Sequence, residues 1–252
     1  MSTWLDHGIL FGAGVVAGTV NVIAGGGSFI TIPLLIFLGL PAGVANATNR
    51  IGIVLQNVGA VWGFNRHGVL PRSILVWTAI PSAAGALLGS WAALAISDAA
   101  FTRILAILMI VVTVWTVWDP LGRGTPPERD RLDRLRHRVL LAAAFVGVGF
   151  YGGFVQAGGG FLMLAVLSVA GIDLVRANAV KVFCALVFTL ASLGLFWAAH
   201  KIAWDAGLSL GLGTLAGGQV GVHLTVLKGH RWVRGVVTLT VILFALKLWF
   251  AP

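Results

Sequence analysis

Long apolar stretches restrict the fold of this chain more than any other feature of its sequence. Eight of them lie between polar breaks, at 5–40, 43–65, 72–96, 101–118, 138–171, 176–199, 203–226 and 233–250. Hydrophobic residues make up 58% of the chain and charged residues 10%, whereas soluble proteins average about 45–50% and about 25%. Runs of about 20 apolar residues are typical of transmembrane helices, and membrane β-strands are about half as long. The sequence therefore predicts an all-α polytopic membrane protein, with 1–252 as a single membrane domain.

The stretches 5–40 and 138–171 are too long for one crossing, because a helix rises about 1.5 Å per residue. Each contains the sequence AGGG, at 24–27 and 157–160. A run of three glycines disfavours a continuous helix. Each long stretch is therefore predicted to form a glycine-broken helical hairpin, followed by three transmembrane helices.

The chain divides into two similar halves, 1–118 and 139–252, around the charged linker 119–138. GLPAGVANATNR at 39–50 matches GIDLVRANAVKV at 171–182, and both follow an AGGG run. Matches in the same order indicate a duplication. Because each half contains an odd number of crossings, the halves are predicted to be inverted repeats, as in many transporters.

Basic residues predict the orientation of the chain. If the linker is cytoplasmic, the hairpin topology places most Lys and Arg residues outside the helices on the cytoplasmic side, as the positive-inside rule requires. We therefore expect a cytoplasmic linker and external N- and C-termini. Single crossings in place of the hairpins would put the basic loop at 226–234 outside.

The glycines have two readings. A half-helix that begins after a break points its positive N-terminus back at the break, where it attracts anions. Alternatively, glycines permit close helix packing, as the GxxxG spacings Gly8/Gly12, Gly14/Gly18, Gly85/Gly89 and Gly213/Gly217 suggest. The recurrence of the breaks favours a binding role for Gly25, Gly26, Gly27, Ser28, Gly158, Gly159 and Gly160. Ser28 and Thr31 are also candidates to cap the half-helix.

Polar residues in apolar stretches complete the candidate site: Asn46, Asn49, Arg50, Gln56, Asn178 and Lys181. Buried charges in a membrane are costly and usually functional. Snorkelling to the interface is the alternative for Arg50 and Lys181. Because no Asp or Glu lies inside the apolar stretches, these cations are expected to attract an anionic ligand. Asn21 and Gln156, which flank the breaks, are candidates for capping.

The residues around the first break, NVIAGGGSFITIPLLIFLGLPAGVANATNR, resemble the first signature of the sulfite exporter TauE/SafE family, and AGGGFLMLAVLSVAGIDLVRANAVKV resembles its second copy. The resemblance implies a bacterial or archaeal inner-membrane permease that moves sulfur-containing anions such as sulfite or organosulfonates. The second copy departs from the first, with Val166 for Pro33, Asp173 for Pro41 and Lys181 for Asn49. Family membership does not define the substrate.

The expected function is export of such an anion by alternating access around a midplane site. An anion channel of the same fold, a transition-metal permease and a non-transporting membrane subunit remain alternatives. No P-loop, nucleophile–base pair or metal-ligand spacing is present in the sequence, so no enzyme activity, metal or cofactor is expected. The expected partners are the anion and membrane lipid, with no nucleic acid; a homo-oligomer is left open.

Overall fold

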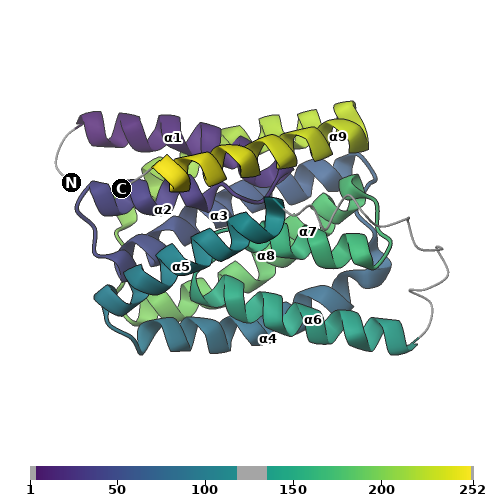
Figure 1. Cartoon of the computed structure of the whole chain (residues 1–252), viewed down its shortest axis with the longest axis horizontal. Helices are drawn as coiled ribbons and strands as arrows, with labels where there is room; N and C mark the ends of the chain where they lie inside the picture. The colour runs from purple at the N-terminus through teal and green to yellow at the C-terminus, as the bar shows by residue number, and fades with distance from the viewer. Residues whose placement is uncertain (1–3, 118–134, 251–252) are drawn as a thin grey trace.

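The computed structural model describes residues 4–117 and 135–250, with the side chains of all of these except 109–110, 112–117 and 229–250. Every regular element in these ranges is an α-helix, and the helices run roughly side by side (Figure 1). They are α1 (Trp4–Ile23), α2 (Ser28–Phe37), α3 (Ala42–Arg66), α4 (Arg72–Leu94), α5 (Asp98–Val117), α6 (Leu135–Phe154), α7 (Gly159–Val169), α8 (Leu174–Ala198) and α9 (Trp204–Phe250). The predicted all-α architecture is confirmed. Residues 119–134 of the predicted linker lie outside the described part.

Five helical segments of the described chain are long and apolar enough to cross a membrane: α1, α4, α6, α8 and residues 204–228 of α9. Helix α3 is not among them, although its 25 residues would rise about 38 Å, because it carries several buried polar side chains. Large apolar side chains such as Trp62, Leu88 and Trp91 are exposed on the outer surface. Such a surface suits contact with lipid. The chain is thus a multi-pass membrane protein.

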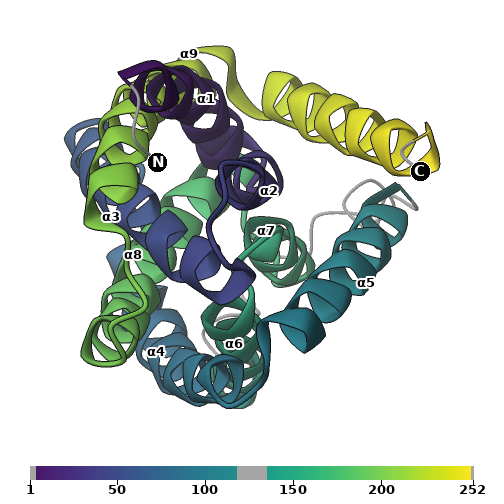
Figure 2. The same cartoon turned by 90° about the vertical axis from the view of Figure 1, so that its left-hand side faces the viewer.

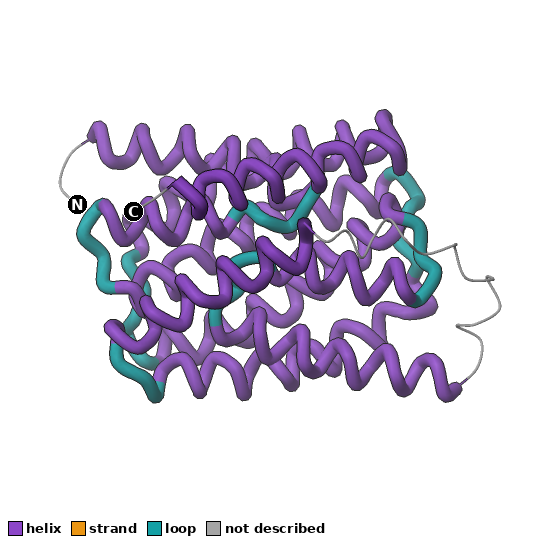
Figure 3. The backbone as a smooth tube through the Cα atoms, viewed as in Figure 1, coloured by secondary structure: helices purple, strands orange, loops and turns teal. Residues whose placement is uncertain are grey.

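The chain reverses direction at both glycine breaks. Helix α2 leads back to the end of the molecule at which α1 begins, and α7 does the same for α6 (Figure 1). The non-helical residues of the two breaks lie inside the bundle, whereas the other connections lie at its ends (Figure 3). The short helices α2 and α7 span only 10 and 11 residues. Two half-length helices therefore begin in the interior of the protein.

Glycines with left-handed backbone end both half-helices. Gly39 has φ 94° and Gly171 has φ 86°. The amide of Leu40 donates to the carbonyl of Leu35, and that of Ile172 donates to Leu167. This is the helix-ending pattern that glycine favours, because it adopts positive φ without strain.

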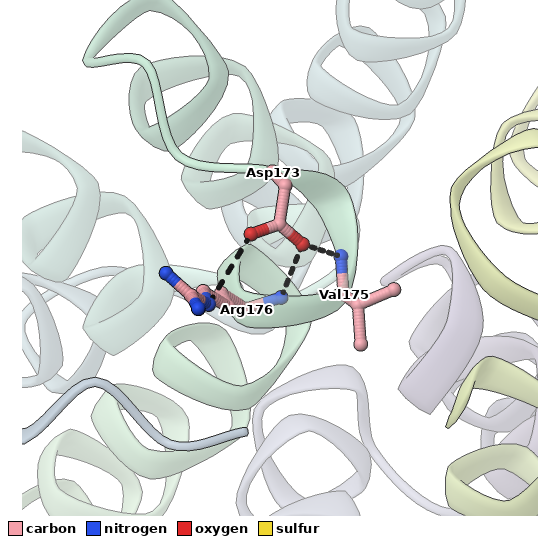
Figure 4. A network of polar contacts seen from close by, with 3 residues as sticks. All are labelled: Asp173, Val175 and Arg176. Atoms are coloured by element: carbon pink, nitrogen blue, oxygen red, sulfur yellow. Dashed lines mark hydrogen bonds and ion pairs between the residues drawn. The ribbon is translucent and has the colours of Figure 1, made fainter. Parts of the chain in front are cut away.

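The next helix of the second half begins at a strong cap. The Asp173 carboxylate accepts hydrogen bonds from the amides of Val175 and Arg176, each at 3.1 Å, and lies 3.5 Å from the Arg176 guanidinium (Figure 4). Helix α3 has Pro41 at the same place and no side-chain cap. The replacement of Pro41 by Asp173 thus exchanges one way of starting a helix for another.

Glycines hold two long helix pairs in backbone contact, α1 with α9 and α4 with α6. A Cβ added at Gly14 or Gly18 would overlap the backbone of α9, and one at Gly85 or Gly89 would overlap that of α6. The packing role of these GxxxG spacings is confirmed. The same prediction of a packing role is wrong for Gly8 and Gly12, because a Cβ added at either residue would have no atom within 4 Å.

The two predicted helices at 203–226 and 233–250 form one continuous element in the structure, α9, of 47 residues. A straight helix of this length would measure about 70 Å, more than twice the hydrocarbon thickness of a bilayer. The path of α9 changes direction instead, and its last part runs back beside α5 (Figure 2). The expected loop at 226–234 is wrong, because α9 is helical throughout that range.

The helix pairing exchanges elements between the halves. The first helix of each half packs on a late helix of the other, α1 on α9 and α6 on α4. The two ends of the described chain lie at the same end of the molecule (Figure 1). Inverted repeats would produce such an arrangement. The repeat relation itself, the boundaries of the halves and the sidedness of the membrane stay predictions.

Candidate functional site

The two glycine breaks touch each other in the interior. A Cβ added at Gly25 would come within 2.5 Å of the Cα of Gly160, and a Cβ at Gly160 would likewise overlap Gly25. Just beyond them, the rings of Phe29 and Phe161 stack with centroids 6.3 Å apart. Gly25 also has φ 94° and Gly158 has φ 75°. Gly25 and Gly160 therefore have a packing role in backbone-to-backbone contact between the first break and the start of α7, and their binding role stays a prediction.

Two asparagines cap the broken helices across the halves. Asn46 on α3 donates from Nδ2 to the carbonyl of Phe154, the last residue of α6, at 3.0 Å. Asn178 on α8 donates to the carbonyl of Ile23, the last residue of α1, at 3.1 Å. Both asparagines are completely buried. Each half thus satisfies a backbone carbonyl that the break in the other half leaves without a helical partner.

Arg50 and Lys181 act on the same helix ends. The Arg50 guanidinium donates to the carbonyls of Gly152 and Gly153 at the end of α6. The Lys181 ammonium donates to the carbonyls of Asn21 and Val22 at the end of α1, at 2.9 and 2.7 Å. Helix C-termini carry partial negative charge and stabilise cations. By these contacts Arg50, and not Asn49, is the counterpart of Lys181.

These contacts change the interpretation of the two cations. Arg50 is 0% and Lys181 3% exposed, so neither side chain snorkels to water. The sequence predicts that no carboxylate pairs with them and that they attract an anionic ligand. The structure adds partial negative charge from the carbonyl ends of α6 and α1, which contact Arg50 and Lys181 respectively, and the anionic ligand stays a prediction. Arg50 also lies 4.6 Å from the ring centroid of Phe196, a distance typical of cation–π contact.

Asn49 joins α3 to the first half-helix. Its Nδ2 donates to the hydroxyl of Ser28 at 3.0 Å, and its Oδ1 accepts from the hydroxyl of Thr31 at 2.6 Å. All three side chains are buried. The expectation that Ser28 and Thr31 cap α2 is wrong, since no side chain caps that helix; their hydroxyls bind Asn49 instead.

A small cavity lies between the half-helices, α3 and α8. Its volume is about 20 Å³, which is enough for about one water molecule. It is lined by Asn21, Ser28, Ile53, Asn57, Gln156, Gly159, Gly160, Met163, Lys181, Val182, Ala185 and Phe188. Helix α8 thus contributes one charged side chain, Lys181, and an apolar wall that includes Phe188, whereas the residues near the two breaks contribute polar groups.

The cavity separates the predicted site residues into two groups. Ser28, Gly159, Gly160 and Lys181 line it. The others lie around it without lining it: Gly25, Gly26, Gly27, Asn46, Asn49, Arg50, Gln56, Gly158 and Asn178. Gln56 is an example, since its amide accepts from Asn21 and donates to Asn57, both at 3.2 Å.

Gln156 and the apolar wall were not predicted as site residues. The sequence makes Gln156 and Asn21 candidates for capping, yet both line the cavity, and Gln156 donates to the Thr189 hydroxyl at 2.7 Å. The available signal is their position shortly before the AGGG runs, one residue before Ala157 and three residues before Ala24. No signal in the sequence pointed to Met163 or Phe188, because apolar residues of this kind fill every helix.

Comparison with known proteins decides the family. The sequence profile described as "Sulfite exporter TauE/SafE" matches residues 10–248, nearly the whole chain. The chain belongs to the sulfite exporter TauE/SafE family. The predicted resemblance is thereby confirmed, and the chain is a TauE/SafE membrane transporter.

Curated TauE/SafE-like relatives cover almost the full length of the chain. A probable membrane transporter protein of Haemophilus influenzae is 31% identical, with 95% of this chain and 93% of the relative aligned. The probable membrane transporter protein YfcA of Escherichia coli K12 is 30% identical over 96% and 88% of the two chains. One from Sinorhizobium, ORF9, is 29% identical over 96% and 92%. No solved structure matches the chain.

Proposed function

We propose that this TauE/SafE transporter exports a small sulfur-containing anion, sulfite or an organosulfonate, by alternating access around the cavity between the two breaks. The observation that carries the proposal is the cavity itself. It lies where two half-helices begin, and its one charged lining residue is Lys181. Both features favour an anion over a cation.

Unused backbone donors support anion binding. None of the backbone hydrogen bonds found in the described chain is donated by the amides of Gly26, Gly27 or Ser28. These amides stand at the N-terminus of α2, where the helix dipole places positive partial charge. Oxyanions bind such helix ends through backbone N–H groups.

The cavity volume supports a moving site. A cavity of about 20 Å³ holds one water molecule but no polyatomic anion. Gly160, which lines the cavity, is in direct contact with Gly25 of the first break. For an anion to enter, α2 and α7 have to separate, which is the motion that alternating access between two halves provides.

The membrane potential favours the export direction. With the inside negative, moving one negative charge outward is favourable by about 2.3 kcal/mol per 100 mV. No carboxylate lines the cavity, so the proposed mechanism uses no acidic proton relay. Outward uniport of the anion is the simplest mechanism of this kind.

Flux measurements in proteoliposomes test the proposal. Purified protein is reconstituted, loaded with sulfite or sulfoacetate, and efflux is measured while a potassium gradient with valinomycin sets the potential. We expect saturable efflux that a negative interior accelerates. Lys181→Met should abolish it, and Lys201→Met is the matched control, because Lys201 is exposed in a connecting loop.

Other outcomes would contradict the proposal. Flux that increases linearly with anion concentration would indicate a channel. Flux of nickel without anion flux would indicate a metal permease. Unchanged saturable flux in Lys181→Met would show that the binding site lies elsewhere.

A further inference from the structure

The cavity carries one hydrogen-bond acceptor and one donor that no protein group satisfies. Oε1 of Gln156 and Nδ2 of Asn57 are buried and have no hydrogen-bond partner. Gln156 is 7% and Asn57 1% exposed, and both residues line the cavity. Leaving a buried polar group unpaired is costly. A ligand that pairs with both groups would recover this cost.

The backbone of Gln156 is unusual as well. Its φ of 65° is positive, and His200 is the only other non-glycine residue of the described chain with positive φ. Positive φ is disfavoured for side chains other than glycine and is retained mainly where it serves a function. The matched position before the first break is Ile23, which lies in helix α1. The strained polar residue is thus specific to the second break.

In the structure, the nitrogen end of the Gln156 amide faces a neighbouring hydroxyl, and its oxygen end is left free. Nε2 donates to Oγ1 of Thr189 on α8 at 2.7 Å. Thr189 is completely buried and does not line the cavity. Thr189 therefore acts as a positioning residue that leaves Oε1 as the unpaired atom.

The other polar groups of the cavity do not replace Gln156. The Lys181 ammonium uses its three donors on Asn21 O, Val22 O and Asn178 Oδ1. Lys181 thus supplies positive charge but no unused hydrogen. The Asn57 amide supplies an unused donor, whereas the Gln156 Oε1 supplies an unused acceptor, which an oxyanion without hydrogens leaves unpaired.

We propose that Gln156 is a specificity-determining residue that accepts a hydrogen bond from the transported anion. The preferred substrate is then a sulfur oxyanion that carries its own O–H or N–H group, such as a hydroxy- or aminosulfonate or hydrogen sulfite. Its oxygens accept a hydrogen bond from the Asn57 amide and are attracted by the positive charge of Lys181. Its own O–H or N–H group donates a hydrogen bond to Oε1 of Gln156. This inference rests on the proposed anion transport.

Two sulfonates of equal charge test the assignment. Uptake of 2-hydroxyethanesulfonate and ethanesulfonate, which differ by one hydroxyl, is compared in proteoliposomes by kcat/KM. We expect a preference of about tenfold or more for the hydroxylated anion, because sites built to bind a substrate hydroxyl reject analogues that lack it. Gln156→Met keeps the side-chain length without the acceptor and should reduce the preference to within about twofold.

Two further variants separate the side chain from the backbone. Gln156→Gly relieves the strain of the positive φ and also removes the side-chain amide, so this variant should lose the preference for the hydroxylated anion as well. If the variant keeps the preference, the preference comes from the shape of the backbone, and the proposal is overturned. Thr189→Val leaves the cavity lining intact but frees the amide to rotate. It should weaken the preference while ethanesulfonate uptake stays unchanged, and an unchanged preference would contradict the positioning role.

The remaining outcomes distinguish this inference from the proposed function. If the chain moves sulfite but neither sulfonate, flux is measured across pH. In the native chain, the flux must then change with pH in proportion to the concentration of hydrogen sulfite, and in Gln156→Met this proportionality must be lost. Any other result contradicts the inference. Equal transport of both sulfonates overturns the role of Gln156 and leaves anion transport standing. No transport of any sulfur anion overturns both.

Discussion

Replacing Gly160 by alanine places a methyl group where the start of α7 touches the first break. The added Cβ would lie 2.9 Å from the carbonyl oxygen of Gly25 and closer still to its Cα. Contacts below 3.0 Å require movement of one partner. Because the neighbour is backbone, no side chain can rotate away. The substitution therefore has to push α7 away from the first break.

The expected cost follows from this overlap. Overpacking a well-packed interior costs about 1–3 kcal/mol, and Gly160 lies in α7 and has no left-handed backbone. Gly25→Ala meets a similar overlap at φ 94°, and the left-handed backbone adds about 1–2 kcal/mol. Gly25→Ala should therefore be the more damaging change, at about 2–5 kcal/mol, a large part of a stability that is typically about 5–15 kcal/mol.

Gly159→Ala is the matched control. It lies in the same helix next to Gly160, and its added Cβ would meet Tyr151 at 3.7 Å, an ordinary van der Waals distance. Alanine in a helix is more favourable than glycine by up to about 1 kcal/mol. Thermal unfolding in detergent should therefore show a lower melting temperature for Gly160→Ala, with reduced sulfite efflux, and an unchanged or higher one for Gly159→Ala. Equal melting temperatures for the two variants would refute the contact between the breaks.

Three further predictions concern the surrounding structure. Arg50→Met removes the cationic donor from the end of α6 and should destabilise the protein by about 1–3 kcal/mol in detergent melting; native-like stability would show that α6 does not depend on it. Thr31→Val deprives a buried amide oxygen of its 2.6 Å donor and should cost about 1–3 kcal/mol by the same measurement. In a Cys184→Ser background, His67→Cys should react with an impermeant maleimide only from the cytoplasmic side and Lys201→Cys only from outside, whereas labelling of both from one side would refute the predicted topology.

Much of the fold was accessible from local sequence. Apolar stretches of helix length predicted the class, and three consecutive glycines predicted both breaks, because each depends on neighbouring residues alone. The exception is the C-terminal region, where polar residues between 226 and 234 suggested a loop. In the structure the backbone stays helical through these residues, because polar side chains do not by themselves end a helix.

The candidate site was only partly accessible. Asn46, Arg50, Asn178 and Lys181 were recognised as important because polar residues in membrane helices rarely lack a function. Their partners were not predicted. Arg50 was expected to attract a ligand, yet it binds the carbonyl end of a helix about 100 residues away along the chain.

Local sequence patterns suffice to predict that the chain lies in a membrane, that it is helical, and that two of its long stretches break at glycine. These properties follow from hydrophobic burial and backbone freedom, which act over one or two turns. Three features are visible only in the folded chain: the breaks meet at Gly25 and Gly160, each half caps the broken helix of the other, and Gln156 keeps an unpaired acceptor beside the cavity. Such features depend on which distant backbones come into contact, and hydrogen bonding in a low-dielectric interior then selects the partners.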